Sequence, residues 1–395
     1  MTPRAKWCSC GSGWSRIGRL LAVVGLIAGS STTSAQDVSP IVEFGSQRSP
    51  IRISAQAVFE HYKSGSIDLR ETSFPLTATI PLGRRLGLQL SGNAGLVSGS
   101  DLASIQSIGD FQTSLGYGFS LGKASVVATA TANLPSGKDE LTSEELETTI
   151  LLSQHAFDFG LPSFGQGMQF ASQVGFAYPF GDQFAVGAGI AYHLRGGFKP
   201  VIGLEDDYIP GNELMFVLGA DVRISSVTTA SVDVGYAQYA VDKLGSDDFF
   251  ELGDKTTATV KVQSRPGSSR VVIVGRVQRW ADSRFVTEDV SEEGAAVSTS
   301  QRSLPTQFLG SGLYEFDASS RIRLGVMVQA RLLAEVGSFR KTSGELIELG
   351  SKEIVSVGVL PLLRVSRQTA VTSRFVYSAV GITGIEAGVG LVLTI

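Results

Sequence analysis

The sequence predicts an all-β protein, an antiparallel transmembrane β-barrel of about 16 strands, with about 14 as the alternative count. Three observations predict this fold. Large apolar residues alternate with small or polar residues over long segments, short connections alternate with long ones, and an export signal precedes the strands. Glycine contributes 46 of the 395 residues, and small residues on the inner face of a barrel leave room for a lumen.

The alternation is clearest between residues 168 and 195. Large apolar residues occupy most alternate positions from Met168 to Tyr178 and, after a turn at 179–182, from Phe184 to Leu194. The residues between them are small or polar. Successive side chains of a strand point to opposite faces, so this stretch is a hairpin with one apolar and one polar face. Each strand is long enough to cross a membrane at a tilt.

The N-terminus predicts export. Basic residues at positions 4, 6, 16 and 19 precede the apolar run Leu20–Ala28, and Ser34-Ala35 offers the small residues of a cleavage site. The run is too short for a spanning helix. We therefore expect a cleaved signal peptide at 1–35, a periplasmic segment at 36–51 and the barrel at 52–395. The two cysteines, Cys8 and Cys10, would be removed with the signal peptide.

Extended segments follow one another from residue 52 onwards. The first alternates poorly and is either a strand or part of a periplasmic plug. The second contains Pro75 and Pro81, which weaken the prediction because proline cannot donate to a ladder. The predicted segments are 52–62, 72–82, 86–93, 110–119, 124–134, 168–178, 184–195, 214–224, 231–236, 256–263, 270–280, 304–316, 321–331, 353–364, 369–380 and 385–395.

The connections between these segments alternate in length. Short ones are expected at 83–84, 121–122, 179–182, 225–227, 265–269 and 317–320, and long ones at 97–109, 135–165, 196–212, 241–253, 281–303 and 335–352. Bacterial outer-membrane barrels have short periplasmic turns and longer outer loops, whereas a soluble β-sandwich has no reason to keep this rhythm. The pattern predicts the bacterial outer membrane as the location, with both termini in the periplasm.

The longest connection, 135–165, contains a predicted helix. Thr142 and Glu145 form the S/T-x-x-E pattern of a capping box, and the apolar spacing that follows extends the helix to about Gln154. The segment is rich in apolar residues, which are most cheaply buried against the barrel mouth. It is either a constriction or only a cover, and the constriction candidates are Leu146, Ile150, Phe157, Phe159 and Phe164.

Charged and amide residues inside the strands mark the predicted lumen wall. On the lipid face near the midplane, an arginine or lysine would cost roughly 2–4 kcal/mol, but facing inward it is paired or hydrated. The mixed signs argue against a strongly charge-selective pore. The lumen-facing candidates are Gln169, Gln173, His193, Arg195, Asp221, Arg223, Asp233, Arg321, Arg323, Arg331, Arg374 and Glu386.

Motifs for catalysis are absent from the sequence. It contains no metal-ligand cluster, phosphate loop or nucleophile elbow, and the three histidines are widely separated. We therefore expect no enzymatic activity and no cofactor, and a net charge of −4 gives no reason to expect nucleic acid. The expected partners are outer-membrane lipids, a small-molecule solute and, during insertion, the barrel-assembly machinery.

Several short motifs resemble a known family. Ile108-Gly109-Asp110 leads into LGYGF at Leu115–Phe119, and NLPSG at Asn133–Gly137 follows the next strand. Gly165–Gly167 and Tyr208–Gly211 fit the same pattern, although Ser136 replaces the usual threonine. This stretch resembles the predicted outer-membrane transporters labelled "MetA pathway of phenol degradation", which are similar to the long-chain fatty-acid transporter superfamily.

That resemblance implies a channel for small hydrophobic or aromatic compounds. The predicted function is therefore an outer-membrane channel or transporter that lets such a solute cross passively. Three alternatives stay open: a general porin, a structural or adhesive barrel without a pore, and an outer-membrane lipid-modifying enzyme.

Overall fold

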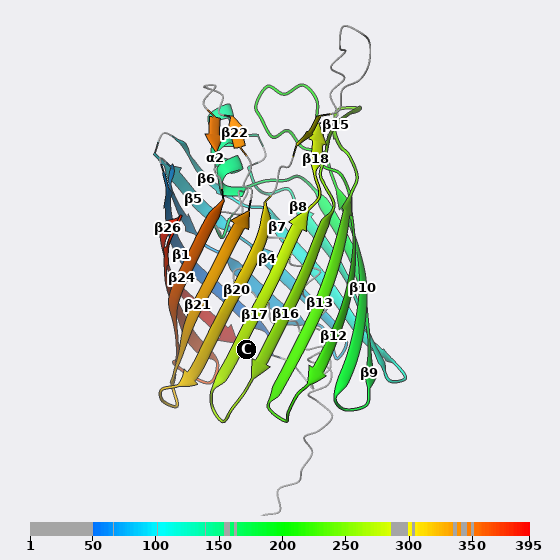
Figure 1. Ribbon diagram of the computed structural model, residues 1–395, viewed down its shortest axis with the longest axis vertical. Coiled ribbons are helices and arrows are strands. Elements are labelled where there is room, and N and C mark those ends of the chain that lie inside the picture. The colour runs from blue at the N-terminus through cyan, green and yellow to red at the C-terminus, as the bar shows by residue number, and fades with distance from the viewer. Residues whose placement is uncertain are drawn as a thin grey trace, which may run out of the picture.

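Tilted antiparallel strands form a closed barrel, with short turns at one end and longer connections at the other (Figure 1). The computed structural model describes residues 50–395 except 66, 101, 139, 154–158, 162–163, 286–298, 302–304, 335–337, 341–345 and 349–350. The predicted signal peptide and nearly all of the predicted periplasmic segment lie outside this part of the chain. We call the two ends of the barrel the short-turn end and the long-loop end.

The main sheet of the described residues has 19 strand segments, which make 16 barrel strands because three of these strands are each interrupted once. The segments are β1 (Arg52–Ser64), β2 (Ile67–Ser73), β3 (Leu76–Pro81), β4 (Leu86–Gly92), β5 (Ala94–Gly99), β6 (Leu102–Ile108), β7 (Phe111–Leu121), β8 (Ala124–Leu134), β9 (Gln169–Phe180), β10 (Phe184–Arg195), β12 (Glu213–Arg223), β13 (Thr228–Tyr239), β16 (Lys255–Ser264), β17 (Arg270–Trp280), β20 (Thr306–Asp317), β21 (Ile322–Ala334), β24 (Lys352–Arg364), β25 (Thr369–Ala379) and β26 (Thr383–Thr394). The predicted fold class is confirmed.

The first strand closes the barrel. β1 pairs with β26 from Arg52↔Thr394 to Lys63↔Thr383, and its other edge pairs with β3 and then β2. The poorly alternating segment 52–62 is therefore a barrel strand and not part of a plug. The strand count is 16 rather than 14.

The predicted apolar face points outward over most of the wall. In the hairpin β9–β10, Val174 is 47% exposed on the outer surface, and its neighbours Phe176 and Ile190 are also exposed. The alternating residues Gln173 and Ala191 pair across the strands on the inner face and are only half-buried. This inside-out arrangement is the one that a membrane-spanning barrel requires.

The prediction of a long loop at 97–109 is wrong. That stretch forms most of a hairpin, β5–β6, which continues the strands beyond the breaks that separate β4 from β5 and β6 from β7. The breaks fall side by side on neighbouring strands, at Phe74-Pro75, at Asn93 and at Gly109-Asp110. They are tied together by hydrogen bonds from the Phe74 N–H to the Asn93 side chain (3.1 Å) and from the Gly109 N–H to the Asn93 carbonyl (2.7 Å).

Beyond these breaks the hydrophobic pattern of the wall is inverted. Large apolar residues of β2, β5 and β6 point inward and are fully buried, with Leu69, Val97 and Ile105 each 0% exposed. The outward residues of β2 are Asp68, Arg70 and Thr72. An apolar inside and a polar outside suit a wall that stands in water, so this part rises above the lipid-facing band. We call it the upper wall.

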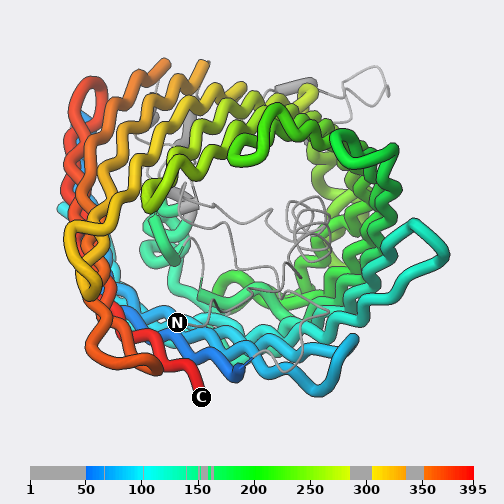
Figure 2. Tube along the Cα trace, turned by 90° about the horizontal axis from the view of Figure 1, so that it is seen from below, coloured from blue at the N-terminus to red at the C-terminus, as the bar shows by residue number. Residues whose placement is uncertain are grey.

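The remaining elements lie in the long connections. The predicted helix in 135–165 is confirmed as α2 (Ser143–Ser153), which lies inside the ring of strands in the end-on view (Figure 2). No helix among the described residues has the length and apolarity that crossing a membrane requires. The short strands of the connections are β11 (Tyr208–Ile209), β14 (Asp242–Leu244), β15 (Asp247–Glu251), β18 (Ser283–Phe285), β19 (Thr299–Gln301), β22 (Ser338–Arg340) and β23 (Leu346–Glu348).

Candidate functional site

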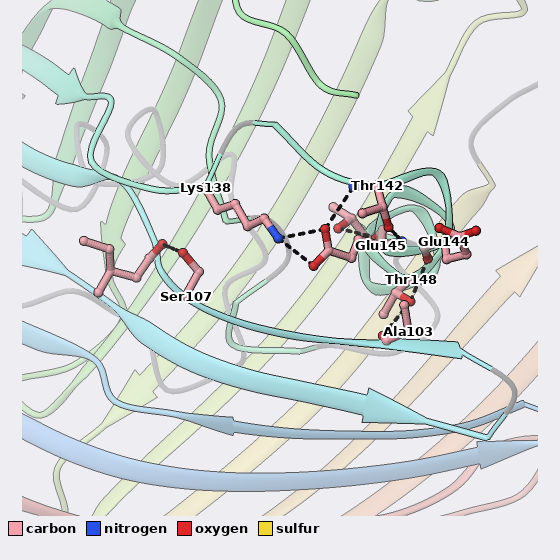
Figure 3. Close-up of polar contacts among 9 residues, drawn as sticks. Ala103, Ser107, Lys138, Thr142, Glu144, Glu145 and Thr148 are labelled. Atoms are coloured by element: carbon pink, nitrogen blue, oxygen red, sulfur yellow. Dashed lines mark hydrogen bonds and ion pairs between the residues drawn. The ribbon is translucent and has the colours of Figure 1, made fainter. Parts of the chain in front are cut away.

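Helix α2 begins with the predicted capping box (Figure 3). The Glu145 N–H donates to the Thr142 hydroxyl (3.2 Å), and the Thr142 N–H donates to the Glu145 carboxylate (2.9 Å). The Lys138 ammonium lies 2.6 Å from the same carboxylate. Burial alone would raise the pKa of Glu145, but the hydrogen bonds from Lys138 and Thr142 bring that pKa below its ordinary value. The start of the helix is therefore fixed to the chain that leads into it.

The helix is held against the upper wall. The hydroxyl of the fully buried Thr148 donates to the Ala103 carbonyl of β6 at 3.0 Å (Figure 3). The chain just before α2 is joined to the next long connection, because Leu141 bridges Val201 and the Ile202 N–H donates to the Leu141 carbonyl (2.8 Å). These contacts place α2 within the long-loop end of the barrel.

An apolar cluster fixes Leu152, Phe159, Leu161 and Phe164 of the 135–165 connection to the inner surface of the wall. Phe159 and Phe164 are each 1% exposed, and the Phe159 ring packs edge-on against Tyr62 of β1 with ring centroids 5.2 Å apart. We call this group the mouth cluster. Its members come from the connection, from the upper wall and from the strands beside it: Tyr62, Ile67, Leu69, Val97, Ile105, Leu152, Phe159, Leu161, Phe164, Leu333, Ile354 and Ile382.

The constriction candidates are distributed unevenly around this cluster. Phe159 and Phe164 belong to it, and Leu146 of α2 is half-buried. Ile150 lies in α2, but its side chain is outside the described part, as is the whole of Phe157. The two phenylalanines are packed within the cluster, so their buried rings anchor the connection to the wall.

Asp110 clamps the base of the connection at both ends. Its carboxylate accepts hydrogen bonds from the N–H groups of Gly137 (2.9 Å) and Gln166 (2.9 Å) and from the Asn133 amide (2.8 Å). A Cβ at Gly137 would lie 1.8 Å from the Phe164 carbonyl, so only glycine fits there. The motifs around residues 109, 137 and 166 are thus three parts of one clamp.

Two carboxyl groups lie beneath the middle of the connection. Glu60 of β1 and Glu71 of β2 are cross-strand neighbours on the inner face, 3% and 0% exposed. The Gly160 N–H donates to the Glu60 carboxylate at 2.9 Å, and the Gly160 carbonyl accepts from Asn93 at 3.5 Å. Gly160 of the connection therefore lies against the inner face of the wall, directly over this acidic pair.

A second charged group lies across the lumen, where β10, β12, β13 and β16 end. The buried Glu213 carboxylate is 2.8 Å from Arg195, 3.7 Å from Lys255 and 3.9 Å from His193. The Arg195 guanidinium also lies over the Tyr239 ring, 5.7 Å from its centroid. Two predicted lumen residues, His193 and Arg195, meet here around a glutamate that was not predicted.

Asp242 clamps the 196–212 connection in the same way as Asp110 clamps the first one. It accepts the Gly211 N–H at 2.6 Å and the Tyr208 hydroxyl. Burial, followed by the negative charge of Asp242, raises the pKa of Tyr208, so this phenol remains a hydrogen-bond donor through neutral and alkaline pH. Motif residues Tyr208 and Gly211 thus have a structural role at the mouth.

Apart from Arg321, the other predicted lumen residues lie on the inner side of the wall at different heights. Arg323 pairs with Asp317 (2.8 Å), Arg374 with Glu386 (2.5 Å), and Arg270 with Glu315 (3.1 Å). The paired side chains outside the buried Glu386 remain between 18% and 32% exposed, so water reaches them inside the barrel. Arg321 lies in the turn before β21 and is exposed; Gln169 and Asp233 are buried, and Gln173, Asp221, Arg223 and Arg331 are half-buried on the inner side.

Sequence reasoning missed Glu60, Glu71, Asp110 and Glu213 as site residues. Glu60 and Glu71 lie where the hydrophobic face changes sides, so alternation did not mark them as inward. Asp110 was part of a quoted motif, and its position between two glycine-rich motifs was the signal that could have revealed a clamp. Among the described residues, no group of three or more acidic, histidine or cysteine side chains is arranged to hold a metal ion.

Comparisons with known proteins find similar solved structures but no matching sequence. No family model and no curated protein matches the sequence. Three similar solved structures are the CymD monoaromatic hydrocarbon channel (TM-score 0.44, 10% identity, 98% of this chain and 99% of that one), an outer-membrane channel of Pseudomonas putida F1 (0.39, 10%, 92% and 100%), and the translocator domain of the autotransporter NalP from Neisseria meningitidis (0.32, 10%, 89% and 90%).

Proposed function

We propose that this chain is an outer-membrane channel through which small hydrophobic or aromatic solutes cross passively. One observation carries the proposal: the interior is polar and accessible to solvent near the short-turn end but apolar at the long-loop end, where described residues of the 135–165 connection pack inside the barrel. A solute that follows the barrel axis meets these two environments in turn.

The hydrated part supports passage rather than a packed structural core. Inward-facing Arg270, Glu315, Arg323 and Asp317 form ion pairs and yet remain 22–32% exposed. Because each charge is balanced by a neighbour, this wall has no strong preference for anions or cations. Passive movement of an uncharged solute with its surrounding water is what such a wall supports.

The mouth supports selection for apolar groups. In the connections after β10 and β13, the rings of Phe198, Tyr208 and Phe249 pack edge-to-face with centroids 5.8 and 6.3 Å apart, and Phe249 is 38% exposed. A sugar or ion passing among such groups loses hydrogen bonds to water, whereas an aryl group loses little and gains contacts with rings. An aromatic or aliphatic solute therefore crosses the mouth at lower cost.

Conductance and solute uptake test this function. Replacing Leu141–Ser153 with a glycine–serine linker of equal length removes the apolar contacts of α2 and keeps the chain length. We expect higher ion conductance in planar bilayers and slower uptake of an aromatic hydrocarbon into proteoliposomes, while the barrel still resists heat in detergent. Unchanged conductance and uptake in a folded barrel would rule out a constriction at this connection.

A general porin is the second candidate, favoured by the hydrated ion pairs of the lumen. Liposome swelling separates the two functions. If the wild-type protein admits a sugar as fast as an aromatic compound of similar size, the channel is a general porin. Selective uptake of the aromatic compound supports the first proposal.

The orientation in the membrane can be tested separately. We propose that the long-loop end is extracellular, which places Ser143 of α2 outside the cell and Ser319 of a short turn in the periplasm. On intact cells, an impermeant thiol reagent should label Ser143→Cys and leave Ser319→Cys unlabelled. The opposite labelling would invert the topology without affecting the fold.

A further inference from the structure

Three glutamates occupy one row across neighbouring strands at the mouth. Glu60 of β1 pairs in register with Glu71 of β2 on one side and with Glu386 of β26 on the other. All three are on the inner face and are at most 5% exposed. Like charges opposite one another in a sheet destabilise it, so a row of this kind requires compensation.

A cation lies beside one end of this row. Arg374 of β25 lies 2.5 Å from Glu386, at the far side of Glu60 from Glu71. Glu71 makes no hydrogen bond of normal length to any described residue, although Glu60, Ser73 and the Leu161 backbone are its polar neighbours. Its partner on β5 is the apolar Val97, and the next inward residue of β1 is Tyr62. Within the described part of the chain, the groups that face Glu71 are thus one acid and neutral groups.

The connection lies directly on this acidic pair. A Cβ at Gly160 would lie 3.3 Å from a Glu60 oxygen, 3.4 Å from the Ser73 hydroxyl and 3.5 Å from a Glu71 oxygen. The flanking Phe159 and Leu161 are buried in the mouth cluster and keep water away from the carboxyl groups. The acids can therefore gain full hydration only if the segment Phe159–Leu161 moves away.

We propose that Glu60 and Glu71 share a proton and form a latch that holds Phe159–Leu161 in the mouth until that proton is lost. Two adjacent carboxyl groups out of water favour a state with one proton between them, because two buried like charges repel. The charged member accepts the Gly160 N–H, as Glu60 does. Loss of the proton at alkaline pH favours hydration of both groups and release of the segment.

The direction of the effect follows from linkage. The closed mouth binds a proton that the open, hydrated mouth does not bind near neutral pH, so falling pH strengthens closure and rising pH weakens it. This regulation rests on the proposed function, since release of the segment is what would widen the channel. The latch itself is a property of the mouth and can be measured without any transport.

Thiol labelling of the full-length protein in detergent measures the latch. Leu161→Cys places a reporter thiol in the buried segment. Ser143→Cys places a reference thiol at an exposed position at the start of α2. Dividing the two reaction rates with a methanethiosulfonate reagent cancels the effect of pH on thiol ionisation. We expect this ratio to rise about tenfold between roughly pH 6 and roughly pH 9.

Variants of the acidic pair assign the effect. Glu71→Gln should make the ratio independent of pH, Glu71→Asp should retain the rise, and Glu144→Gln on the exposed face of α2 should leave it unchanged. If Leu161→Cys does not fold, Leu152→Cys, which is also buried in the mouth cluster, replaces it. A flat ratio in the wild-type background, or an equal rise with Glu71→Gln, would overturn the latch.

Conductance measured over the same pH range separates the latch from the channel. A pH-dependent labelling ratio with no conductance at any pH leaves the latch in place and removes the proposed channel function. Steady conductance with a flat labelling ratio removes the latch and leaves the channel in place.

Discussion

The lipid-facing barrel and the upper wall are built from the same strands but follow opposite rules. In β3, Leu76 points outward and is 50% exposed, whereas in β2, on the same interrupted strand, Leu69 points inward and is fully buried. The outside of β3 contacts lipid in a membrane, whereas the outside of β2 has the polar surface of a protein in water. The difference teaches that the solvent outside, and not the strand itself, decides which face is apolar.

The interiors of the two regions also differ in polarity. The spanning part has partly exposed ion pairs on its inner face, and the upper wall packs a buried apolar cluster against the 135–165 connection. The breaks at Phe74-Pro75, Asn93 and Gly109-Asp110 mark the border between the two. The mouth is therefore packed like a small water-soluble protein, with an apolar core inside and a polar surface outside, and it lies at one end of a membrane barrel.

The largest expected effect breaks the upper wall alone. Leu69→Ala leaves a cavity in the mouth cluster and should destabilise the mouth by about 2–5 kcal/mol. Hydrogen exchange should show faster opening of α2 and β6 while the spanning strands stay protected. Leu76→Ala is the matched control, because it exchanges one lipid contact for another and leaves no cavity. Equal effects of the two variants would contradict the inversion of the two faces.

The next effect breaks the spanning part alone. Val174→Arg places a charge on the lipid-facing surface and should cost roughly 2–4 kcal/mol or prevent insertion. Gln173→Arg, one residue away on the inner face, should be tolerated. Folding into lipid vesicles, read by heat resistance in gel electrophoresis, compares the two. Equal insertion would show that the faces of β9 are assigned wrongly.

The clamp at the border should have an intermediate effect. Asp110→Asn replaces an oxygen that accepts backbone N–H groups with an NH₂ group, which cannot accept them, and should cost about 1–3 kcal/mol of local stability. Protease cleavage within 135–165 measures the loss, with the exposed Glu205→Gln as control. Cleavage at the wild-type rate would mean that the mouth cluster holds the connection without the clamp.

The smallest effect depends on pH and concerns α2. The folded-state pKa of Glu145 lies below the ordinary 4.5, so its contribution is present above that pH and is lost as the pH falls through the lowered value. Glu145→Gln keeps an oxygen that accepts the Thr142 N–H but removes the charge that pairs with Lys138, so it should cost about 0.2–1 kcal/mol of helix stability near neutral pH and much less in acid. Amide exchange in α2 at both pH values measures the difference; an equal cost at both would assign the effect to packing.

The sequence predicted the barrel because lipid acts on every second residue of a long strand. Strands such as β9 and β10 therefore display their fold without any knowledge of their neighbours, and the short turns could be placed between them. The capping box at Thr142 and Glu145 was predictable for a similar reason, since its hydrogen bonds join residues within one turn of helix.

Only the tertiary structure decided how the mouth is built. The contacts that define it join residues far apart in the chain, such as Gly160 with Glu60 and Gln166 with Asp110. The inversion along β1 and β2 depends on where the lipid ends, and that height is set by the assembled wall. A periodic sequence pattern could not predict this inversion, because the apolar face changes sides within these strands and the local alternation is lost. Short-range periodicity in the sequence thus determines the membrane fold. The acidic pair and the clamps form only because closure of the barrel brings distant parts of the chain together.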